Sequence, residues 1–439
     1  MWLCYEFLLL IGLLCYVPGA MARRRLPHRG WSMRLGCYPA TMTRSLRGRE
    51  AIWVHAVRVG EVLAARPLLQ ALARAAPEAP LALSTITPSG FAVAAQQMAD
   101  RDGIVTYFPL DLRPCVRRAL ETLRPRLLLL MESELWPTMI RETTARRIPM
   151  AVVNGRISSR AFARYRWVAP WFRGIAGRVD LYLMQSQTDA ERAIALGAAP
   201  DRVRVVGSLK WEASIGTRPS VDLVQETARR LGLDGREPLI VAGSTHRGEE
   251  IAVLDAFQAL RGSHPRTRLI IAPRHLERVD EVEALSRQSG LTCARLSKSE
   301  PGVDWQVGLV DTLGQLPRYY GLASIVFIGG SLIPHGGQNP LEATSLGKTV
   351  LFGPFMHNFA DIAEQLLSHQ AARQLTGASE LSAAFQTLLT RRSDAEAMGK
   401  RAKELTERSQ GALQRIMEAL QPLLERATPN PGQREHADT

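Results

Sequence analysis

The chain has 439 residues, of which 46% are hydrophobic and 22% are charged. This globular composition excludes collagen, a coiled-coil rod and wholesale disorder. Its 55 Lys and Arg residues exceed its 42 Asp and Glu residues by 13, so we expect a surface that favours nucleic acid, acidic lipid or a phosphorylated substrate. The five cysteines are scattered and form no C-x-x-C pair, which indicates neither a disulfide framework nor a zinc site.

The N-terminus holds the one stretch of the sequence that is apolar enough to enter a bilayer. Residues 2–20 contain a single acid, Glu6, and three arginines follow at 23–25. A cleaved signal peptide would carry its positive charge before the apolar run, whereas arginines after it favour a cytoplasmic location for the rest of the chain. We therefore expect residues 1–22 to form an uncleaved membrane anchor, either spanning or interfacial, and the Arg-rich residues 23–49 to rest on anionic headgroups.

From residue 51 onward, short apolar runs alternate with helical segments. The first series predicts strands at Ile52–Ala56, Leu81–Ser84, Val105–Phe108, Leu127–Met131, Met150–Val153 and Leu181–Met184. After a pause near Pro219, the second series predicts strands at Leu239–Ala242, Leu269–Ala272, Val307–Leu309, Ile325–Ile328 and Val350–Phe352. Fully apolar strands between helices are typical of buried parallel sheets, so the pattern predicts an α/β protein with two doubly wound, Rossmann-like domains in series.

We place the domain boundaries from this alternation. Residues 23–215 form the predicted N-terminal domain, residues 216–426 form a C-terminal domain that includes the closing helices, and the polar tail 427–439 is predicted to be disordered. We expect the two domains to face each other across a cleft, because ligands of parallel sheets bind at the carboxyl ends of the strands. That arrangement suits an enzyme that joins a nucleotide-activated donor to an acceptor, although a fold alone does not identify the chemistry.

Carboxylates follow two of the predicted strands in the N-terminal domain. Gly60 and Glu61 stand where the first strand ends and a helix begins, so Glu61 is equally consistent with complementing the helix dipole and with acting as a general base. The motif ESELWP (132–137) follows a fully apolar strand, and Glu132 and Glu134 share one side if that strand continues. Two carboxyl groups at the end of one strand favour a functional site over simple helix entry.

Lys210 lies in the motif VVGSLKWE (205–212), just before the predicted domain junction. The chain has only five lysines among its 55 basic residues, and a lysine ammonium suits contact with a phosphate or a carboxylate. The composition and the position favour a functional role over an ordinary surface lysine.

The C-terminal domain carries Gly-rich and basic motifs after its strands. GSTHRGEE (243–250) offers hydroxyls and a helix N-terminus, and APRH (272–275) offers Arg274, although a surface ion pair is about as consistent with that arginine. DTLGQL (311–316) forms a tight turn, and FIGGSLIPHGGQNPLEA (327–343) is the densest constellation. Glycines let a backbone approach a phosphate, and the first-turn carboxylate in the last motif is placed to accept from ribose hydroxyls. These motifs predict a nucleotide site.

Several common signatures are missing from the sequence. It contains no D-x-D, no G-x-S-x-G and no H-E-x-x-H, and its histidines are too dispersed to suggest a metal site. We therefore expect no metal and no cofactor, and charge on a leaving phosphate would be met by Arg274, Lys210 and helix N-termini.

In order along the chain, the motifs VGEV, ESELWP, GSLK, STHRGEE, PRH, DTLGQL and GGSLIPHGGQNPLEA resemble the 3-deoxy-D-manno-octulosonic acid (Kdo) transferases of Gram-negative bacteria. The resemblance implies a membrane-associated GT-B glycosyltransferase on the cytoplasmic face of the bacterial inner membrane. It implies CMP-Kdo as the donor, the phosphorylated lipid A precursor (lipid IVA) as the acceptor, an anionic membrane surface as a partner, and no nucleic acid.

The resemblance also implies roles for individual residues. The family's proton acceptor falls on Glu61, and its transition-state stabilisers fall on Glu132 and Lys210. Its CMP contacts fall on Pro273, Arg274, Leu313, Gly314, Gln315, Asn339, Pro340, Leu341 and Glu342. Two positions depart from the family pattern, because Arg58 stands where Ser is usual and Gln315 stands where Glu is usual. Neither change removes a proposed catalytic group.

Two other classes of protein fit the same architecture. One is a GT-B transferase that uses a UDP-sugar, which a comparison of CMP and UDP binding would separate from a CMP-sugar enzyme. The other is a two-Rossmann nucleotide-sugar epimerase, which is soluble and transfers nothing, so the predicted anchor argues against it.

Overall fold

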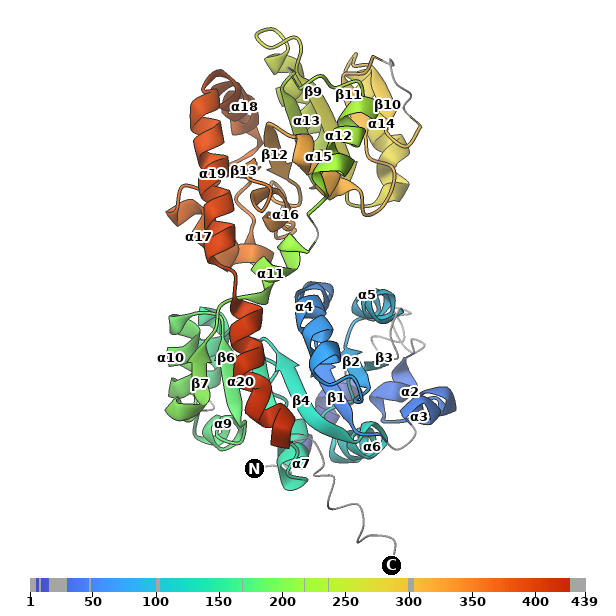
Figure 1. Ribbon diagram of the computed structural model, residues 1–439, viewed down its shortest axis with the longest axis vertical. Coiled ribbons are helices and arrows are strands. Elements are labelled where there is room, and N and C mark those ends of the chain that lie inside the picture. Colours follow the sequence, from blue (N-terminus) through green and yellow to red (C-terminus); the bar gives the residue numbers. More distant parts are fainter. Residues whose placement is uncertain are drawn as a thin grey trace, which may run out of the picture. The chain divides into compact units, whose positions relative to one another are not determined.

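The chain is described by a computed structural model that covers residues 5–7, 9–15, 30–46, 49–99, 103–167, 169–216, 218–235, 237–298 and 304–426. It divides into two compact units: Met1–Ala213 together with Gly411–Thr439, and Ser214–Gln410 (Figure 1). Each unit contains a seven-stranded parallel sheet with helices on its faces, which confirms the predicted α/β fold. The predicted disordered tail, 427–439, lies outside the described residues.

The sheet of the first unit has the strand order β3-β2-β1-β4-β5-β6-β7. Its strands are β1 (Ala51–His55), β2 (Leu81–Thr85), β3 (Gly103–Tyr107), β4 (Pro125–Met131), β5 (Met150–Gly155), β6 (Leu181–Met184) and β7 (Val203–Val205). The six strands predicted for this half are therefore confirmed, because each is an apolar run long enough for one buried strand. The direction of strand order reverses between β1 and β4, which makes their carboxyl ends the topological switch point of this sheet.

Helices cover both faces of the first sheet. They are α2 (Trp31–Arg34), α3 (Ala40–Leu46), α4 (Val59–Ala75), α5 (Pro88–Met98), α6 (Arg113–Leu123), α7 (Pro137–Ala145), α8 (Ser159–Trp167), α9 (Ala169–Ala176), α10 (Gln187–Ala195), the 3₁₀ helix η1 (Pro200–Arg202), α11 (Leu209–Ile215) and α20 (Ala412–Arg426). Ile52 and Val54 of β1 pack in one core with α4, α5 and α20, whereas Trp53 packs in the other core with α6, α7, α9 and α10. Alternate side chains thus serve opposite faces, as the pleat of a strand requires.

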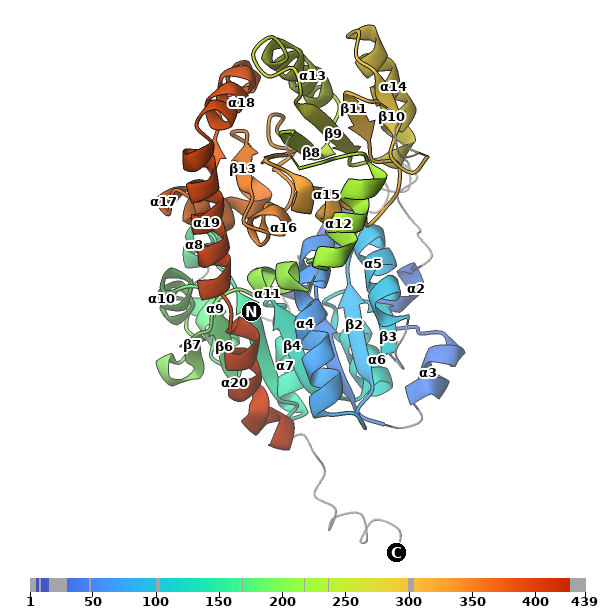
Figure 2. The ribbon, with the colours of Figure 1, turned by 45° about the horizontal axis from the view of Figure 1, so that its top comes forward.

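The last helix belongs to the first unit, although we expected it to close the C-terminal domain. α20 lies beside α4 in both views (Figures 1 and 2). Its apolar residues Ile416, Leu420 and Leu423 join the core of the first unit, and the Arg415 side chain donates to the Val206 carbonyl at 2.9 Å. The apolar stripe of α20 shows that it must be buried, but the stripe carries no information about which sheet it covers.

The second sheet has the strand order β10-β11-β9-β8-β12-β13-β14. Its strands are β8 (Leu239–Thr245), β9 (Arg268–Pro273), β10 (Cys293–Arg295), β11 (Val307–Leu309), β12 (Ile325–Ile328), β13 (Thr349–Phe352) and β14 (Arg373–Gln374). The five strands predicted for this half are confirmed. The strand order reverses between β8 and β12, so the loops that follow these two strands form the switch point of this sheet.

Helices α13, α14 and α18 pack against one core of the second sheet, and α15, α16 and α19 contact its strands β8 and β13. The helices of this unit are α12 (Val221–Arg230), α13 (Glu249–Leu260), η2 (Leu276–Arg278), α14 (Val279–Gln288), α15 (Leu316–Leu322), α16 (Leu341–Thr344), η3 (His357–Phe359), α17 (Ala360–Ser368), η4 (Ala378–Glu380), α18 (Leu381–Thr390) and α19 (Arg392–Arg408).

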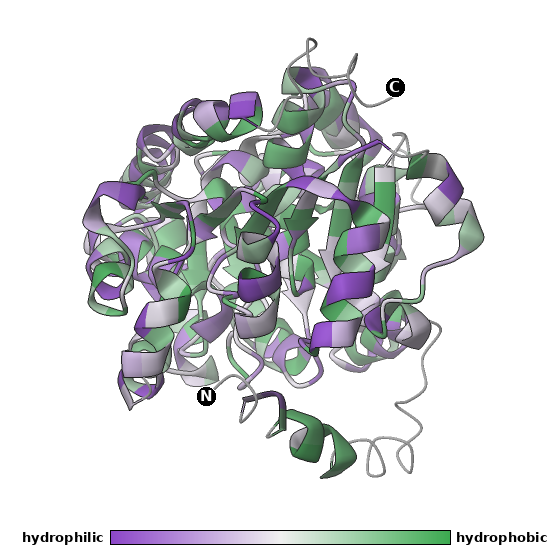
Figure 3. Ribbon diagram, turned by 90° about the horizontal axis from the view of Figure 1, so that it is seen from below, coloured by the Kyte–Doolittle hydropathy of each residue, from purple (hydrophilic) through white to green (hydrophobic). Residues whose placement is uncertain are grey.

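Part of the predicted anchor is described, as a helix at residues 5–7 and 9–15. Figure 3 shows this helix as strongly hydrophobic, and Phe7, Leu10, Ile11 and Leu14 are exposed on it. Within the described residues, no helix is long and apolar enough to cross a membrane. The rest of the predicted anchor, and the first residues of the Arg-rich segment that follows it, lie outside the described ranges.

Candidate active site

Three carboxylates and a lysine gather at the switch point of the first sheet. Glu61 lies in the first turn of α4, which follows β1, and Glu132 directly follows β4. Because β1 and β4 are hydrogen-bonded neighbours, their carboxyl ends bring these two residues together. Glu134 and Lys210 belong to the same group, because the charges of both shift the pKa of Glu61 and Lys210 forms an ion pair with Glu132. The structure thus gathers residues that lie up to 149 positions apart in the sequence.

Glu61 combines a structural bond with an unusual electrostatic environment. Its Oε2 accepts the backbone N–H of Val57 at 2.7 Å, which satisfies one donor at the start of α4. Burial, followed by repulsion from the Glu132 carboxylate, raises the pKa of Glu61 to about 8, while the Val57 N–H and Lys210 act in the opposite direction. A carboxyl group with a pKa near neutrality is suited to exchange a proton with a substrate.

Glu132 forms an ion pair with Lys210, whose Nζ lies 3.0 Å from Glu132 Oε1. Their side chains are only 19% and 17% exposed, respectively, so this pair is shielded from bulk water. The φ angle of Glu132 is +56°, a left-handed conformation that is uncommon for a residue with a side chain and that clusters at functional sites. Lys210 is held from the other side, because the N–H of Leu209 donates to Asn154 Oδ1 at 2.8 Å.

Glu134 is the third carboxylate of the group. Burial, and then repulsion from Glu132, raises the pKa of Glu134 to about 7. Arg58 opposes this rise. Arg58, one of the two positions that depart from the family pattern, therefore compensates charge beside Glu134.

In the second unit, the predicted nucleotide motifs follow β9, β11 and β12. Arg274 follows β9 and is exposed, and its backbone N–H donates to the Thr245 carbonyl at 2.9 Å. Pro273 is the last residue of β9 and is buried. Leu313, Gly314 and Gln315 form the loop between β11 and α15. Among the described residues, no hydrogen bond or ion pair links this loop to Arg274 or to residues 339–342.

The motif 327–343 is built around its Asn-Pro turn. Asn339 Oδ1 accepts the N–H of Leu341 at 3.0 Å, and Asn339 Nδ2 lies 3.5 Å from Glu342 Oε1. Burial raises the pKa of Glu342, while Asn339 and Arg274 act to lower it. Because Arg274 influences this carboxyl group, the structure brings together the predicted contacts after β9 and after β12.

Three histidines meet beside these loops, although their sequence positions suggested no cluster. The ring centroid of His246 lies 4.0 Å from that of His335 and 5.7 Å from that of His275. Each histidine follows a different strand, and only the sheet order places the three together. Among the described residues, no three His, Cys, Asp or Glu side chains are arranged to hold a metal ion.

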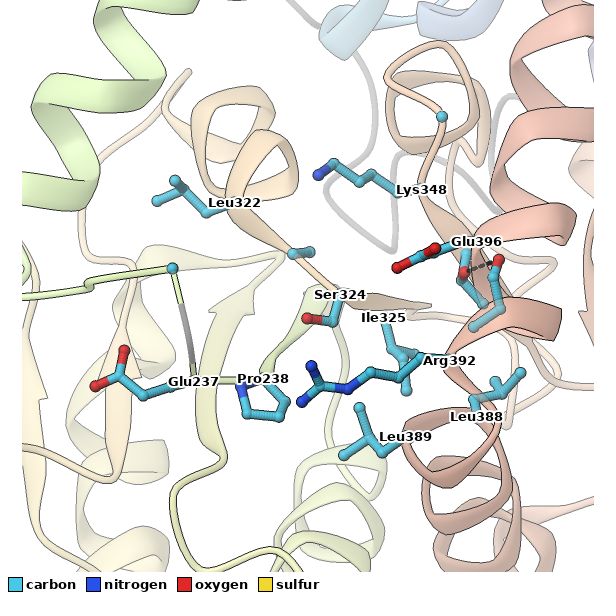
Figure 4. Close-up of a pocket in the computed structure, with 15 residues that line it drawn as sticks. Glu237, Pro238, Leu322, Ser324, Ile325, Lys348, Leu388, Leu389, Arg392 and Glu396 are labelled. Carbon is cyan, nitrogen blue, oxygen red and sulfur yellow. Dashed lines mark hydrogen bonds between the residues drawn. The ribbon is translucent and has the colours of Figure 1, made fainter.

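A cavity of about 350 Å³ lies at the opposite edge of the second sheet, at the amino ends of β8, β12 and β13. Figure 4 shows Lys348, Arg392 and Glu396 around it. None of the residues that the sequence predicts for the site lines this cavity. It is therefore separate from the motifs, which stand at the carboxyl ends of the strands.

Comparisons with known proteins agree with the motifs. A profile of the family described as 3-deoxy-D-manno-octulosonic-acid transferase (kdotransferase) matches residues 29–213. The 3-deoxy-D-manno-octulosonic acid transferase of Haemophilus influenzae is 32% identical over 419 residues, which cover 95% of each chain. The enzyme of the same name from Bordetella pertussis is 35% identical, over 85% of this chain and 87% of its own.

Among solved structures, the UDP-GlcNAc 2-epimerase from Neisseria meningitidis bound to UDP-GlcNAc is similar in fold. Its TM-score is 0.53 at 14% sequence identity, over 85% of this chain and 100% of that chain. At this identity the similarity supports the two-Rossmann architecture and nothing about the reaction. The chain belongs to the 3-deoxy-D-manno-octulosonic acid transferase family and is a glycosyltransferase.

Proposed function

We propose that this protein transfers Kdo from CMP-Kdo to the phosphorylated lipid A precursor, lipid IVA, in lipopolysaccharide biosynthesis, with inversion at the anomeric carbon. The relatives are named for transfer of Kdo, which supports the sugar. The motif loops of the second unit support a nucleotide donor, because they offer Arg274, a Gly-rich backbone and the half-buried carboxyl group of Glu342 at the carboxyl ends of parallel strands. The net charge of +13 favours a phosphorylated acceptor.

The observation that carries the proposal is the group formed by Glu61, Glu132 and Lys210. In the proposed step, an acceptor hydroxyl oxygen attacks the anomeric carbon of Kdo and forms the new glycosidic bond. The bond between that carbon and the phosphate oxygen breaks, and CMP leaves with the electron pair. The hydroxyl proton moves to the Glu61 carboxylate. The pKa of Glu61 is about 8, which is close enough to neutral pH for the group both to accept a proton and to release it.

Glu132 and Lys210 are proposed to stabilise the transition state together. An oxocarbenium-like anomeric carbon develops positive charge, which the Glu132 carboxylate stabilises, and Lys210 holds that carboxylate at 3.0 Å. Both charges are largely shielded from water, so their effect on a developing charge is stronger than it would be in solution. The negative charge that develops on the leaving CMP is assigned to Arg274 and the backbone amides of the second unit, without a metal or another cofactor.

We also propose that the protein acts on the cytoplasmic face of the bacterial inner membrane. The apolar helix at residues 5–7 and 9–15 exposes Phe7 by 64% and Leu14 by 66%, and Trp167 at the end of α8 is 90% exposed. Arg164 and Arg166 lie in the last turn of α8. Apolar side chains beside arginines are typical of a surface that rests on anionic lipid, where a lipid acceptor is available.

The proposal is tested by incubating the purified full chain with CMP-Kdo and lipid IVA and analysing the lipid by mass spectrometry. We expect the lipid to gain mass in steps of one Kdo residue, which also counts the sugars transferred. A lipid that remains unmodified under conditions in which CMP binds would refute the proposed acceptor. Binding of UDP in preference to CMP would instead favour a UDP-sugar enzyme of the same architecture.

A further inference from the structure

One buried carboxylate, that of Glu249, joins the two loops at the switch point of the second sheet. Glu249 is the first residue of α13, and it is fully buried. Its Oε2 accepts the N–H of His246 at 2.9 Å and that of Gly330 at 2.6 Å. Its Oε1 accepts the N–H of Ser331 at 3.0 Å and that of Leu332 at 2.9 Å. Four backbone donors from two loops therefore converge on one side chain.

These two loops carry polar groups at the carboxyl ends of β8 and β12, where the nucleotide site is proposed. The loop after β8 carries His246, and the loop after β12 carries His335 and Gln338. The backbones approach closely where these loops begin, because a Cβ atom added to Gly329, the first residue after β12, would lie 2.4 Å from the carbonyl oxygen of Ser244 near the end of β8. The two loops therefore start from a close backbone approach at Gly329, a position that tolerates no side chain. The hydrogen bonds to Glu249 then join the loops beyond this point.

A hydrogen bond between Gln338 and His246 also determines which ring nitrogen of His246 carries the proton. Gln338 Nε2 lies 3.1 Å from His246 Nε2. An amide nitrogen is a donor, so His246 Nε2 accepts and the imidazole proton resides on Nδ1. Burial lowers the pKa of His246 to about 4, and His335, His275, Arg274 and Arg278 act in the same direction, so this imidazole is neutral at physiological pH.

We propose that Glu249 is a positioning residue for the donor nucleotide, acting through the loops after β8 and β12. The inference rests on the proposed function for the identity of that nucleotide. Glu249 is buried beneath the loops, and its carboxylate oxygens are already occupied by four N–H groups, so it acts on the ligand through the placement of His335, Gln338 and the turn that begins at Asn339. Ligands of parallel sheets bind at this switch point.

An amide cannot replace this carboxylate. A carboxylate presents two acceptor oxygens, whereas glutamine presents one oxygen and one NH₂ group. In Glu249→Gln, the NH₂ group would face two of the four backbone N–H donors, whichever way the amide is turned. Two bonds are lost and two donors are opposed to another donor, so the loops move apart even though the side chain keeps its size.

The neighbouring residue provides a matched control. Glu250 is also fully buried in the first turn of α13, but its carboxylate pairs with the Arg278 guanidinium at 2.7 and 3.2 Å and makes no bond to the loop after β12. Glu250→Gln therefore removes a buried ionic contact of the same helix turn and leaves the two loops joined. If nucleotide binding weakened only because the protein is less stable, both variants would bind the nucleotide more weakly. If Glu249 positions the loops, only Glu249→Gln binds it more weakly.

The experiment compares the full-length wild type, Glu249→Gln and Glu250→Gln. Thermal unfolding reports stability, calorimetry reports the Kd for CMP, and initial rates report KM for CMP-Kdo and for the lipid acceptor. We expect both variants to unfold at lower temperature. Only Glu249→Gln should raise the Kd for CMP and the donor KM, by roughly tenfold or more, because each lost bond to a charged group contributes measurably; its acceptor KM should stay within about twofold.

Two results would overturn the inference: a folded Glu249→Gln variant that binds CMP as the wild type does, and equal weakening of CMP binding by Glu250→Gln. If Glu249→Gln does not fold, Glu249→Asp keeps the charge but is one methylene shorter. We then expect faster amide exchange at Gly330 and Ser331 together with weaker CMP binding, and unchanged values of both would contradict the role. A wild type that binds UDP in place of CMP would refute the proposed donor, and the same variants compared with UDP would still test Glu249.

Discussion

Lys210 Nζ lies 3.0 Å from Glu132 Oε1, and neither side chain is more than one-fifth exposed. The two residues come from different elements, because Glu132 follows β4 whereas Lys210 is the second residue of α11. α11 is seated through Asn154 at the end of β5. β5, the strand next to β4, therefore determines the position of Lys210. The free-energy cost of removing each charge from water is offset by its attraction to the other.

Replacing Lys210 with Met is expected to change the pH dependence of the reaction. Lys210 lowers the pKa of Glu61, so its loss raises that pKa, and the rise of kcat/KM with pH should move to higher pH by about one unit. We also expect kcat to fall by about 10² or more, because the charge that orients Glu132 is gone. The exposed Lys298 provides the control, and Lys298→Met should leave the profile unchanged. An unshifted profile in Lys210→Met would contradict the role of the pair.

Glu61→Gln should remove the proton acceptor while preserving nucleotide binding. Since the pKa of Glu61 is about 8, the group is mostly protonated at pH 6 and becomes an active base as the pH rises through 8. We expect wild-type kcat/KM to increase over that range, and the variant to lose about 10²–10⁴ in kcat with no such increase. Rates measured from pH 6 to 9, with Glu50→Gln as an exposed control, test this. Near-normal turnover of Glu61→Gln would assign the base elsewhere.

Glu142 is expected to stabilise the first unit in a pH-dependent way. Its buried carboxylate accepts from Arg113 at 3.1 Å, Arg117 at 2.9 Å and Arg146 at 2.8 Å. Burial acts to raise the pKa of Glu142, but the three guanidinium groups outweigh it and lower the pKa to about 2. The stabilisation is therefore complete above the unfolded pKa of about 4.3 and is lost as the pH falls from there through 2.

We expect Glu142→Gln to lower the free energy of unfolding by about 2 kcal/mol at pH 7, because three guanidinium groups lose the buried carboxylate that they share, although they stay partly hydrated. The difference from wild type should shrink below pH 4. Glu121, which is 66% exposed and 3.7 Å from Arg146, is the matched control, and Glu121→Gln should cost less than about 0.5 kcal/mol. Urea unfolding at pH 7 and at about pH 3, which lies between the folded and the unfolded pKa of Glu142, measures both variants. A pH-independent difference would contradict the assignment.

Tyr5 is expected to tie the N-terminal helix to α7. Its hydroxyl donates to Asp111 Oδ2 at 2.8 Å, and the Asp111 carboxylate also accepts the N–H of Thr138 at 2.9 Å and that of Met139 at 2.8 Å. Burial raises the pKa of Asp111 to about 6, and these bonds oppose the rise. Tyr5→Phe removes one of them and should raise that pKa further.

We expect Tyr5→Phe to lower stability by about 1 kcal/mol and to speed amide exchange at Thr138 and Met139. Hydrogen exchange and thermal unfolding measure the two effects. Phe7→Ala, which alters a side chain that is 64% exposed on the same helix, should change neither. If exchange at α7 were the same in Tyr5→Phe and wild type, the helix would not be coupled to α7 through this bond.

Trp167 is expected to contribute to lipid binding. It is 90% exposed, and burying a large aromatic side chain contributes about 2 kcal/mol, so Trp167→Ser should weaken binding to vesicles that contain anionic lipid by roughly thirtyfold. Binding should also weaken with added salt, because arginines in the same helix turn contribute electrostatic attraction. Val221→Ser, at a position that is 71% exposed in the second unit, is the control. Equal binding of Trp167→Ser and wild type would exclude this contact.

Much of the fold was predictable because its signals are local. Each predicted strand is an apolar run of strand length between helical segments, and both faces of a doubly wound sheet must be buried, so the runs contain no polar alternation. The motif loops were likewise predictable as groups, because parallel strands place all their carboxyl ends at one edge of a sheet. The order of strands within a sheet has no such local signal.

The sequence by itself determined which residues follow the strands: Glu61, Glu132 and Arg274 come after β1, β4 and β9 whatever the order of strands in the sheets. Only the tertiary structure decided that β1 lies beside β4, that the loop carrying His246 meets the one carrying His335, and that α20 covers the first sheet. The physical reason is that strand pairing and helix docking depend on complementary packing between segments that are distant in the sequence. The free energy of each arrangement depends on all the packed segments together, so it cannot be read from the sequence of any one of them.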